Sequence, residues 1–261
     1  MTFTPPIQFC LALFLIAVVG VLRAAVVGHP NRHQQKPSTG MKPGIFCAED
    51  FVQIKDSGVA GGEAVGAPEV QKLEDGRLKI GMVVVDPVRR EISFPAKINQ
   101  RLGLVEYAVV TNKGKVHEAV LVTQVRPIEI HLAALLLKLA PPNGSTEPGR
   151  IAVDVEWEVD RAVKREPLET LIVHAKSAGA LGVGSALRSG AWHYVGSGLS
   201  AELLLDEAEC GVISLISDGI ALIQNPREGR LDDELHAPGP NLPPGEELPV
   251  VVHLFPFVAT K

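Results

Sequence analysis

Apolar residues are most continuous between positions 128 and 140. Only three residues in that run are polar: Glu129, His131 and Lys138. Apolar side chains would cover almost the whole circumference of a helix there, which is typical of a buried helix. Pro127 suits the first helical position, because its missing N–H would have no partner there, and prolines at 141 and 142 end the run. We expect a buried helix over about residues 127–140, too short for the roughly 20 apolar residues of a membrane span.

The segment 151–160 shows the opposite pattern, a strict alternation of side chains. Its odd positions are apolar and four of its even positions are acidic: Asp154, Glu156, Glu158 and Asp160. A period of two predicts a strand with one buried and one polar face. The acidic face could recruit cations, but a solvated sheet face is the stronger expectation. Short runs rich in β-branched and aromatic residues predict further strands at 77–86, 91–98 (broken at Pro95), 168–174, 192–195, 202–205, 211–217, 220–223 and 250–255. Asp218-Gly219 is expected to form a hairpin turn.

A turn signal precedes the predicted helix. Asn112-Lys113-Gly114 separates two apolar runs at 104–110 and 115–123, and glycine supplies the positive φ that tight turns need. We therefore expect a hairpin that leads into the core helix. No alternating βαβ series is visible, so the predicted fold is α+β, a mostly antiparallel β-sheet with one prominent buried helix at about 127–140.

The N-terminal part of the chain differs in composition from the rest. Residues 7–22 are apolar except for Gln8, and small residues follow at 24 and 25, which predicts a signal peptide or an N-terminal membrane anchor over residues 1–25. Both alternatives place the protein outside the cytoplasm, either periplasmic or secreted, with a possible membrane tether through residues 7–22. Residues 26–72 are punctuated by Gly, Pro and Ser and suggest a linker. The compact domain is expected at 73–258.

Charge and cysteine content exclude two classes of function. The net charge is −5, and no basic stripe offers a surface for phosphate backbones, so we expect no nucleic-acid binding. No CxxC pair is present, so neither a cysteine-bound zinc nor an iron–sulfur cluster is expected. Removal of a signal peptide would leave Cys47 and Cys210, which could pair or be buried singly.

Three side chains around the predicted hairpin and helix could carry chemistry. His117 and Glu118 precede the helix that holds His131, and two imidazoles with one carboxylate are a sufficient ligand set for zinc or iron. The spacing is not that of HExxH, and on a regular strand His117 and Glu118 would point to opposite faces. The alternative is that His131 satisfies a polar group in the core.

Two further residues are weaker candidates. Ser197 lies in Gly-Ser-Gly, which does not match the G-x-S-x-G elbow of serine hydrolases and is explained by a turn. Trp192 shares a strand face with Tyr194, so the two aromatic rings would line a pocket or fill the core, and core packing is the stronger expectation.

Five segments in this order resemble the YdjY-domain family: LVEY at 104–107, GKVHE at 114–118, EIHLAALLL at 129–137, WHYVGS at 192–197 and NLPPG at 241–245. The resemblance covers about residues 78–256. It implies an exported bacterial protein of a functionally uncharacterised family. Some members carry a ferredoxin-like label, which does not transfer because this chain lacks the cysteine quartet of such a cluster.

The sequence therefore supports three hypotheses about function. The first is an exported, non-catalytic binding module of YdjY type. The second is a metal-dependent enzyme that uses His117, Glu118 and His131, with Glu118 as ligand or general base. The third is a structural module of the cell envelope. Convergence of the three side chains around an open cavity would favour the enzyme.

Overall fold

Alternate residues along the strands point into a common apolar core. In the computed structural model, which describes residues 68–141, 147–175 and 184–259, strand β7 (Gly149–Val159) buries Ile151, Val153, Val155 and Trp157. The residues between them, among them Asp154 and Glu156, are only partly covered. The alternation predicted from the sequence is confirmed, and it defines an inner and an outer face for the sheet.

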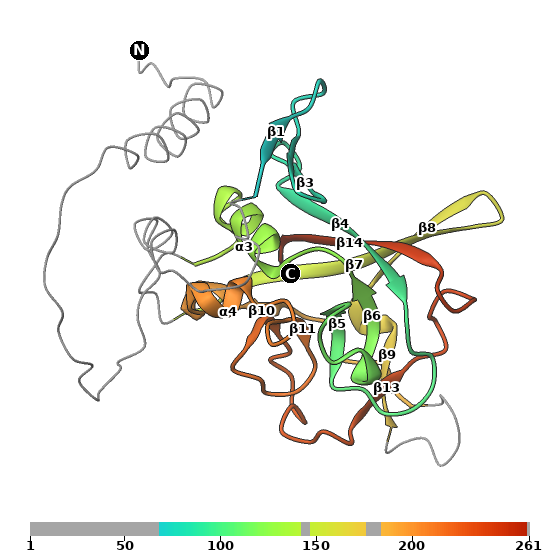
Figure 1. Ribbon diagram of the computed structural model, residues 1–261. Coiled ribbons are helices and arrows are strands. Elements are labelled where there is room, and N and C mark those ends of the chain that lie inside the picture. The colour runs from blue at the N-terminus through green and yellow to red at the C-terminus, as the bar shows by residue number, and fades with distance from the viewer. Residues whose placement is uncertain (1–67, 142–146, 176–183, 260–261) are drawn as a thin grey trace, which may run out of the picture. The chain divides into compact units, whose positions relative to one another are not determined.

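The sheet closes on itself (Figure 1). In ring order its strands are β4 (Glu91–Ile98), β14 (Pro249–Pro256), β7, β10 (Trp192–Tyr194), β12 (Ala221–Gln224), β11 (Gly211–Ser214), β5 (Tyr107–Thr111) and β6 (Ala119–Thr123). β6 then pairs with β4 through Lys97↔Val122 and Ile98↔Leu121, which completes a barrel of eight strands. A mostly β structure agrees with the prediction, whereas closure of the sheet was not predicted.

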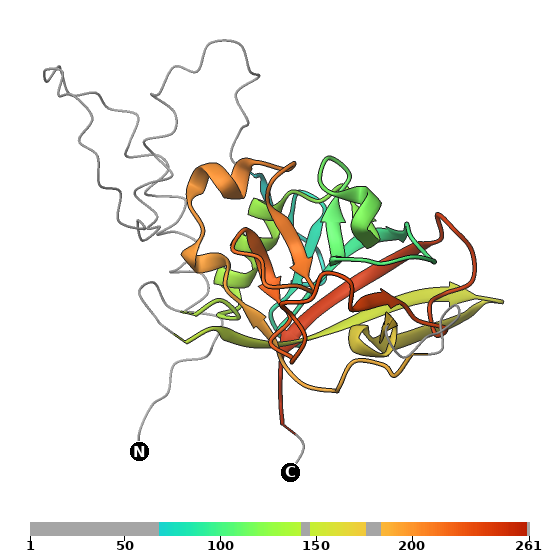
Figure 2. The same cartoon turned by 90° about the horizontal axis from the view of Figure 1, so that it is seen from below.

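Other elements extend from this barrel. β1 (Val70–Lys72), β2 (Leu78–Ile80) and β3 (Val83–Asp86) continue the sheet beyond β4, and β8 (Ala162–Pro167) pairs with β7 alone. β9 (Ile172–His174) and β13 (His236–Pro238) form a separate two-stranded sheet. The short 3₁₀ helices are η1 (Val116–Glu118), η2 (Leu168–Thr170) and η4 (Gly196–Gly198). Figure 2 shows β14 in red running beside β7 and β8 in yellow.

The expected core helix is present as α3 (Pro127–Leu136). Pro127 occupies its first turn, and most of its side chains are buried, as predicted. The helix ends before residue 140 because Leu137 is its C-cap and Lys138 takes a left-handed φ of 55°. It packs against β2, β3, β4 and the short α4 (Ala201–Leu205).

The predicted hairpin before this helix is wrong, because β5 and β6 are parallel. Tyr107 is paired with Ala119 and Thr111 with Thr123. The connection at 112–118 therefore runs back along the strands before β6 begins. The side-chain amide of Asn99 holds this return, donating to the carbonyls of Val116 and Ala119 at 2.7 Å each.

Two other predictions also fail for local reasons. Residues 201–205 are helical rather than extended, because the Ser200 hydroxyl caps the helix by accepting from the Leu203 N–H at 3.3 Å. Asp218-Gly219 makes no hairpin, since the strands on either side of it, β11 and β12, are parallel.

Pro95 does not break β4, contrary to expectation. Its carbonyl accepts from the Thr123 hydroxyl at 2.6 Å, on the edge that faces β6. The N–H and C=O of one strand residue point to the same edge. On this edge the pairing with β3 ends at Ser93 and the pairing with β6 begins at Lys97. The missing N–H of proline falls in the gap between them. It therefore removes no hydrogen bond to β14, which lies on the opposite edge.

Several sequence predictions fall on residues outside the described ranges. These include the apolar run at 7–22, Cys47 and residues 26–67 of the predicted linker, whereas residues 70–72 at the end of that linker form β1; Cys210 itself is buried. No helix within the described ranges is long and apolar enough to cross a membrane.

Candidate functional site

His131 lies in the core of the protein. It projects from α3 with 1% of its surface exposed, and its Nδ1 is 2.8 Å from the hydroxyl oxygen of Tyr194 on β10. The two rings stack with centroids 6.2 Å apart. Desolvation lowers the pKa of His131 to about 4, so the imidazole is neutral at physiological pH. This arrangement matches the alternative in which His131 satisfies a polar group in the core.

His117 and Glu118 lie on the surface, on η1 rather than on a strand. His117 is largely exposed, and its Nε2 is 3.3 Å from the Glu118 carboxylate. Glu118 also faces Glu106. Burial, followed by the proximity of Glu118, raises the pKa of Glu106.

The expected metal-ligand set is not assembled. Across the described ranges, no three His, Cys, Asp or Glu side chains are grouped so that they could hold a metal ion. His117 and Glu118 are adjacent to each other, but the structure does not bring them together with His131. The geometry therefore gives no support to a zinc or iron site formed by these three residues.

Trp192 and Ser197 have structural surroundings. Trp192 is fully buried, its Nε1 donates to Glu169 at 3.3 Å, and the Arg227 guanidinium lies 4.7 Å from its ring centroid. Ser197 lies in η4 and donates to the carbonyl of Pro141 at 3.2 Å. Both agree with the expectation of core packing and a turn.

A different set of side chains forms a polar network on the outer face of the barrel wall. Five residues belong to this outer charge cluster: Glu91 on β4, His253 on β14, Asp154 and Glu156 on β7, and Arg165 on β8. The strand register brings them together, because His253 pairs with Asp154 and Glu156 pairs with Arg165. Directly opposed residues of an antiparallel pair share a face.

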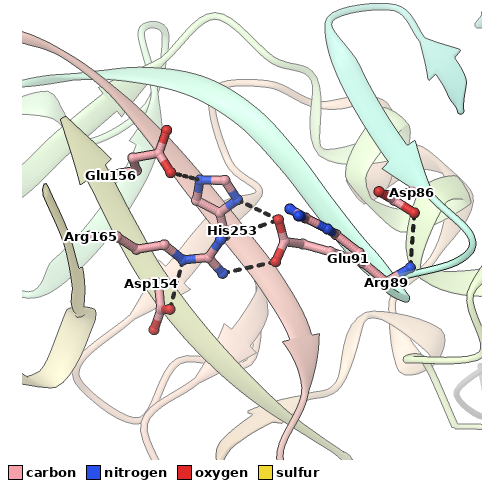
Figure 3. Close-up of polar contacts among 7 residues, drawn as sticks. All are labelled: Asp86, Arg89, Glu91, Asp154, Glu156, Arg165 and His253. Carbon is pink, nitrogen blue, oxygen red and sulfur yellow. Dashed lines mark hydrogen bonds and ion pairs between the residues drawn. The ribbon is translucent and has the colours of Figure 1, made fainter. Parts of the chain in front are cut away.

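Glu91 and Arg165 make the central contacts of the outer charge cluster (Figure 3). Arg165 donates to both oxygens of Glu91, at 3.3 and 2.9 Å, and its Nε donates to Asp154 at 2.9 Å. Nδ1 of His253 is 2.9 Å from the Glu91 carboxylate. The guanidinium also lies 5.3 Å from the ring centroid of Phe255. The bidentate contact between Arg165 and Glu91 fixes the orientation of both side chains.

The cluster holds the Glu91 carboxylate in its ionised form. Burial alone would raise the pKa of Glu91, but hydrogen bonds from Arg165 and His253 outweigh it, so the pKa lies below its usual value. Three carboxylates then face one guanidinium and one imidazole. The cluster is net negative even when His253 is charged.

One buried atom of the cluster lacks a hydrogen bond. Nε2 of His253 is buried and has no hydrogen-bond partner among the described residues. It lies 3.5 Å from the Glu156 carboxylate, which is an ion-pair distance rather than a hydrogen bond. Because Glu156 is about one-third exposed, its carboxylate is the part of the cluster most accessible to a ligand.

Sequence reasoning found only two of the five residues of this site. The alternation at 151–160 placed Asp154 and Glu156 on a polar face, but the sequence analysis treated that face as solvated. It did not single out Glu91, Arg165 or His253. The available signal was a histidine in an otherwise apolar strand (VVVHLF), because a polar residue there needs a partner.

No family model, curated protein or solved structure matches this chain. The similarity to the YdjY-domain family stays a prediction from sequence.

Proposed function

We propose that the domain is a non-catalytic binding module, and that the outer charge cluster recognises a cationic partner. The observation that carries the proposal is a set of three carboxylates on neighbouring strands, which outnumber the one guanidinium and the one imidazole of the cluster. Rigid strands present charges with little loss of side-chain entropy on binding. A surface of this kind orients a partner of opposite charge and raises the rate at which the two associate.

Glu156 is the residue expected to contact the partner. Glu91 and Asp154 accept hydrogen bonds from Arg165, whereas Glu156 makes its contact with the cluster through His253. A primary ammonium or guanidinium group, as in a basic peptide or an amino sugar, supplies the donors that this carboxylate lacks. The bacterial cell envelope, which the apolar run at 7–22 and the resemblance to the YdjY-domain family support, is the compartment we propose for this binding.

The test uses a fluorescent oligolysine peptide and its fully acetylated form as probes. Binding to the full chain is measured by fluorescence anisotropy at two salt concentrations. Glu156→Gln should weaken oligolysine binding about fivefold, the equivalent of about 1 kcal/mol. Glu158→Gln is the matched control, because it removes the same charge from the same strand at an exposed position outside the cluster.

The outcomes separate specific from general attraction. The proposal predicts a loss only in Glu156→Gln and weak binding of the acetylated peptide. Equal losses in both variants would mean attraction to net charge rather than to the cluster. Equal affinity for the acetylated peptide would exclude cation recognition altogether.

The exported location needs its own measurement. The apolar run at 7–22, as either a signal peptide or an anchor, supports it. Fractionation of the host cell with N-terminal sequencing should find the protein outside the cytoplasm, cleaved near residue 25 or retained in the membrane. A cytoplasmic protein with an intact N-terminus would contradict the proposal.

A further inference from the structure

Two histidines outside the predicted metal-ligand set of His117, Glu118 and His131 lie next to each other. His174 on β9 and His236 on β13 are direct register partners in the two-stranded sheet. Their neighbours, Ala175 and Leu235, are joined by a backbone hydrogen bond of 2.6 Å. Backbone groups of the histidines point outward instead, since the His174 N–H donates to Ser185 and the His236 carbonyl accepts from Val105.

This pattern identifies a non-hydrogen-bonded cross-strand pair. In such pairs the two Cβ atoms approach most closely, and both side chains leave the same face. The imidazole centroids are 5.8 Å apart, with the rings inclined at 73°. Two imidazoles that each bind one ion at about 2.0–2.1 Å have centroids roughly 5–6 Å apart, the lower value at a tetrahedral angle. The observed spacing of the two rings lies within this range.

The ring nitrogens of His236, Nδ1 and Nε2, are buried without hydrogen-bond partners among the described residues. The residue is 0% exposed. A buried polar atom without a partner costs about 1–3 kcal/mol, and an absent ion is one of the few explanations for it.

The surroundings also favour a cation. The carboxylate of Asp232 acts electrostatically on the His236 ring. His174 is only partly buried, so an ion can reach the pair from that side. Imidazole nitrogen is a preferred ligand of zinc, copper and nickel rather than of magnesium or calcium.

We propose that His174 and His236 bind one borderline divalent transition-metal ion, Zn²⁺ or Cu²⁺, through one ring nitrogen of each. Since the described residues contain no group of three or more His, Cys, Asp or Glu side chains arranged for a metal, water completes the coordination. This site is independent of the outer charge cluster and of the function proposed for it.

The first test measures Zn²⁺ affinity of the full chain by competition with a chromophoric chelator. The predicted linker at 26–72 contains two histidines, His29 and His33. Both are replaced by Ala in every sample, because they would add weak sites. One equivalent of Zn²⁺ should bind, and His174→Ala should lower its affinity at least about tenfold. His117→Ala, which removes an exposed histidine, should leave the affinity unchanged.

A second variant keeps the proposal testable if loss of an imidazole disturbs folding. His174→Cys places a thiolate at the same ligand position, so Co²⁺ should show a sulfur-to-cobalt charge-transfer band that the parent chain lacks. Failure of Zn²⁺ to bind the parent, or equal affinity in His174→Ala, would overturn the proposal. Absence of the cobalt band in a folded His174→Cys protein would do the same.

Discussion

At the scale of single residues, His131 shows how burial turns a reactive side chain into a structural one. The ring projects from α3 into the core and shares a hydrogen bond with Tyr194, itself fully buried. Burial favours the neutral imidazole over the charged form. The same burial that removes His131 from chemistry makes the fold sensitive to acid.

His131 should therefore make stability depend on pH. Its folded pKa is about 4, against an ordinary value of 6.5. Between these values the unfolded state binds more protons, so the free energy of unfolding falls as the pH drops from 6.5 to 4, by roughly 3 kcal/mol for this residue. Urea unfolding at several pH values should show a smaller fall in His131→Gln. His117→Gln should follow the wild type, and an equal fall in all three proteins would assign the effect to other groups.

At the scale of elements, the contact between α3 and the β2–β3 turn depends on one glycine. Gly81 has a φ of +57°, and a Cβ there would lie 2.3 Å from the Glu129 carboxyl carbon. Glu129 is itself held by Arg126 at 2.8 Å and by the Met82 N–H at 3.4 Å. The carboxylate cannot move aside without losing these bonds.

Gly81→Ala should consequently destabilise the protein more than Gly76→Ala. Gly76 also has a positive φ, of 88°, but open space where its Cβ would be, so its replacement costs only backbone strain. We expect the difference to be about 1–2 kcal/mol, measured by chemical denaturation. The additional substitution Glu129→Ala should reduce the excess cost of Gly81→Ala. Equal effects of the two glycine variants would show that Glu129 adapts freely.

Local patterns predicted the elements better than their pairing. The core helix, the alternating strand β7 and the burial of Trp192 follow from side-chain periodicity, which is a local property. The parallel arrangement of β5 with β6 does not follow from side-chain periodicity. A Gly-containing turn fits a hairpin, but it also fits a connection that reverses once more before β6 begins. The outer charge cluster depends on β4 meeting β14, and no local signal specifies a neighbour that far along the chain.

At the scale of the whole described domain, closure of the barrel depends on a short seam. β4 meets β6 at only two register pairs, against six between β4 and β14. A shallow pocket of about 450 Å³ lies along the seam, lined in part by Pro95, Lys97 and Val122. The Thr123 hydroxyl adds a bond across the seam to Pro95.

Thr123→Val should loosen this seam before any other part of the ring. It removes the bond to Pro95 and the acceptor used by the Val125 N–H, at a cost of about 1–3 kcal/mol. Hydrogen exchange should accelerate in β4 and β6 while β7 stays protected. Thr111→Val, at the register partner on β5, should leave exchange at the seam unchanged. Uniform acceleration in Thr123→Val would show that the ring opens as one unit.

The position of β14 also has a consequence for synthesis on the ribosome. It is the last strand in chain order, yet it stands between β4 and β7. A growing chain therefore cannot close its barrel until residues 249–256 have emerged. Until then β4 and β7 each lack the partner that fills the space between them. Such unpaired edges invite pairing with other chains, so the nascent domain is most exposed to aggregation just before residues 249–256 emerge.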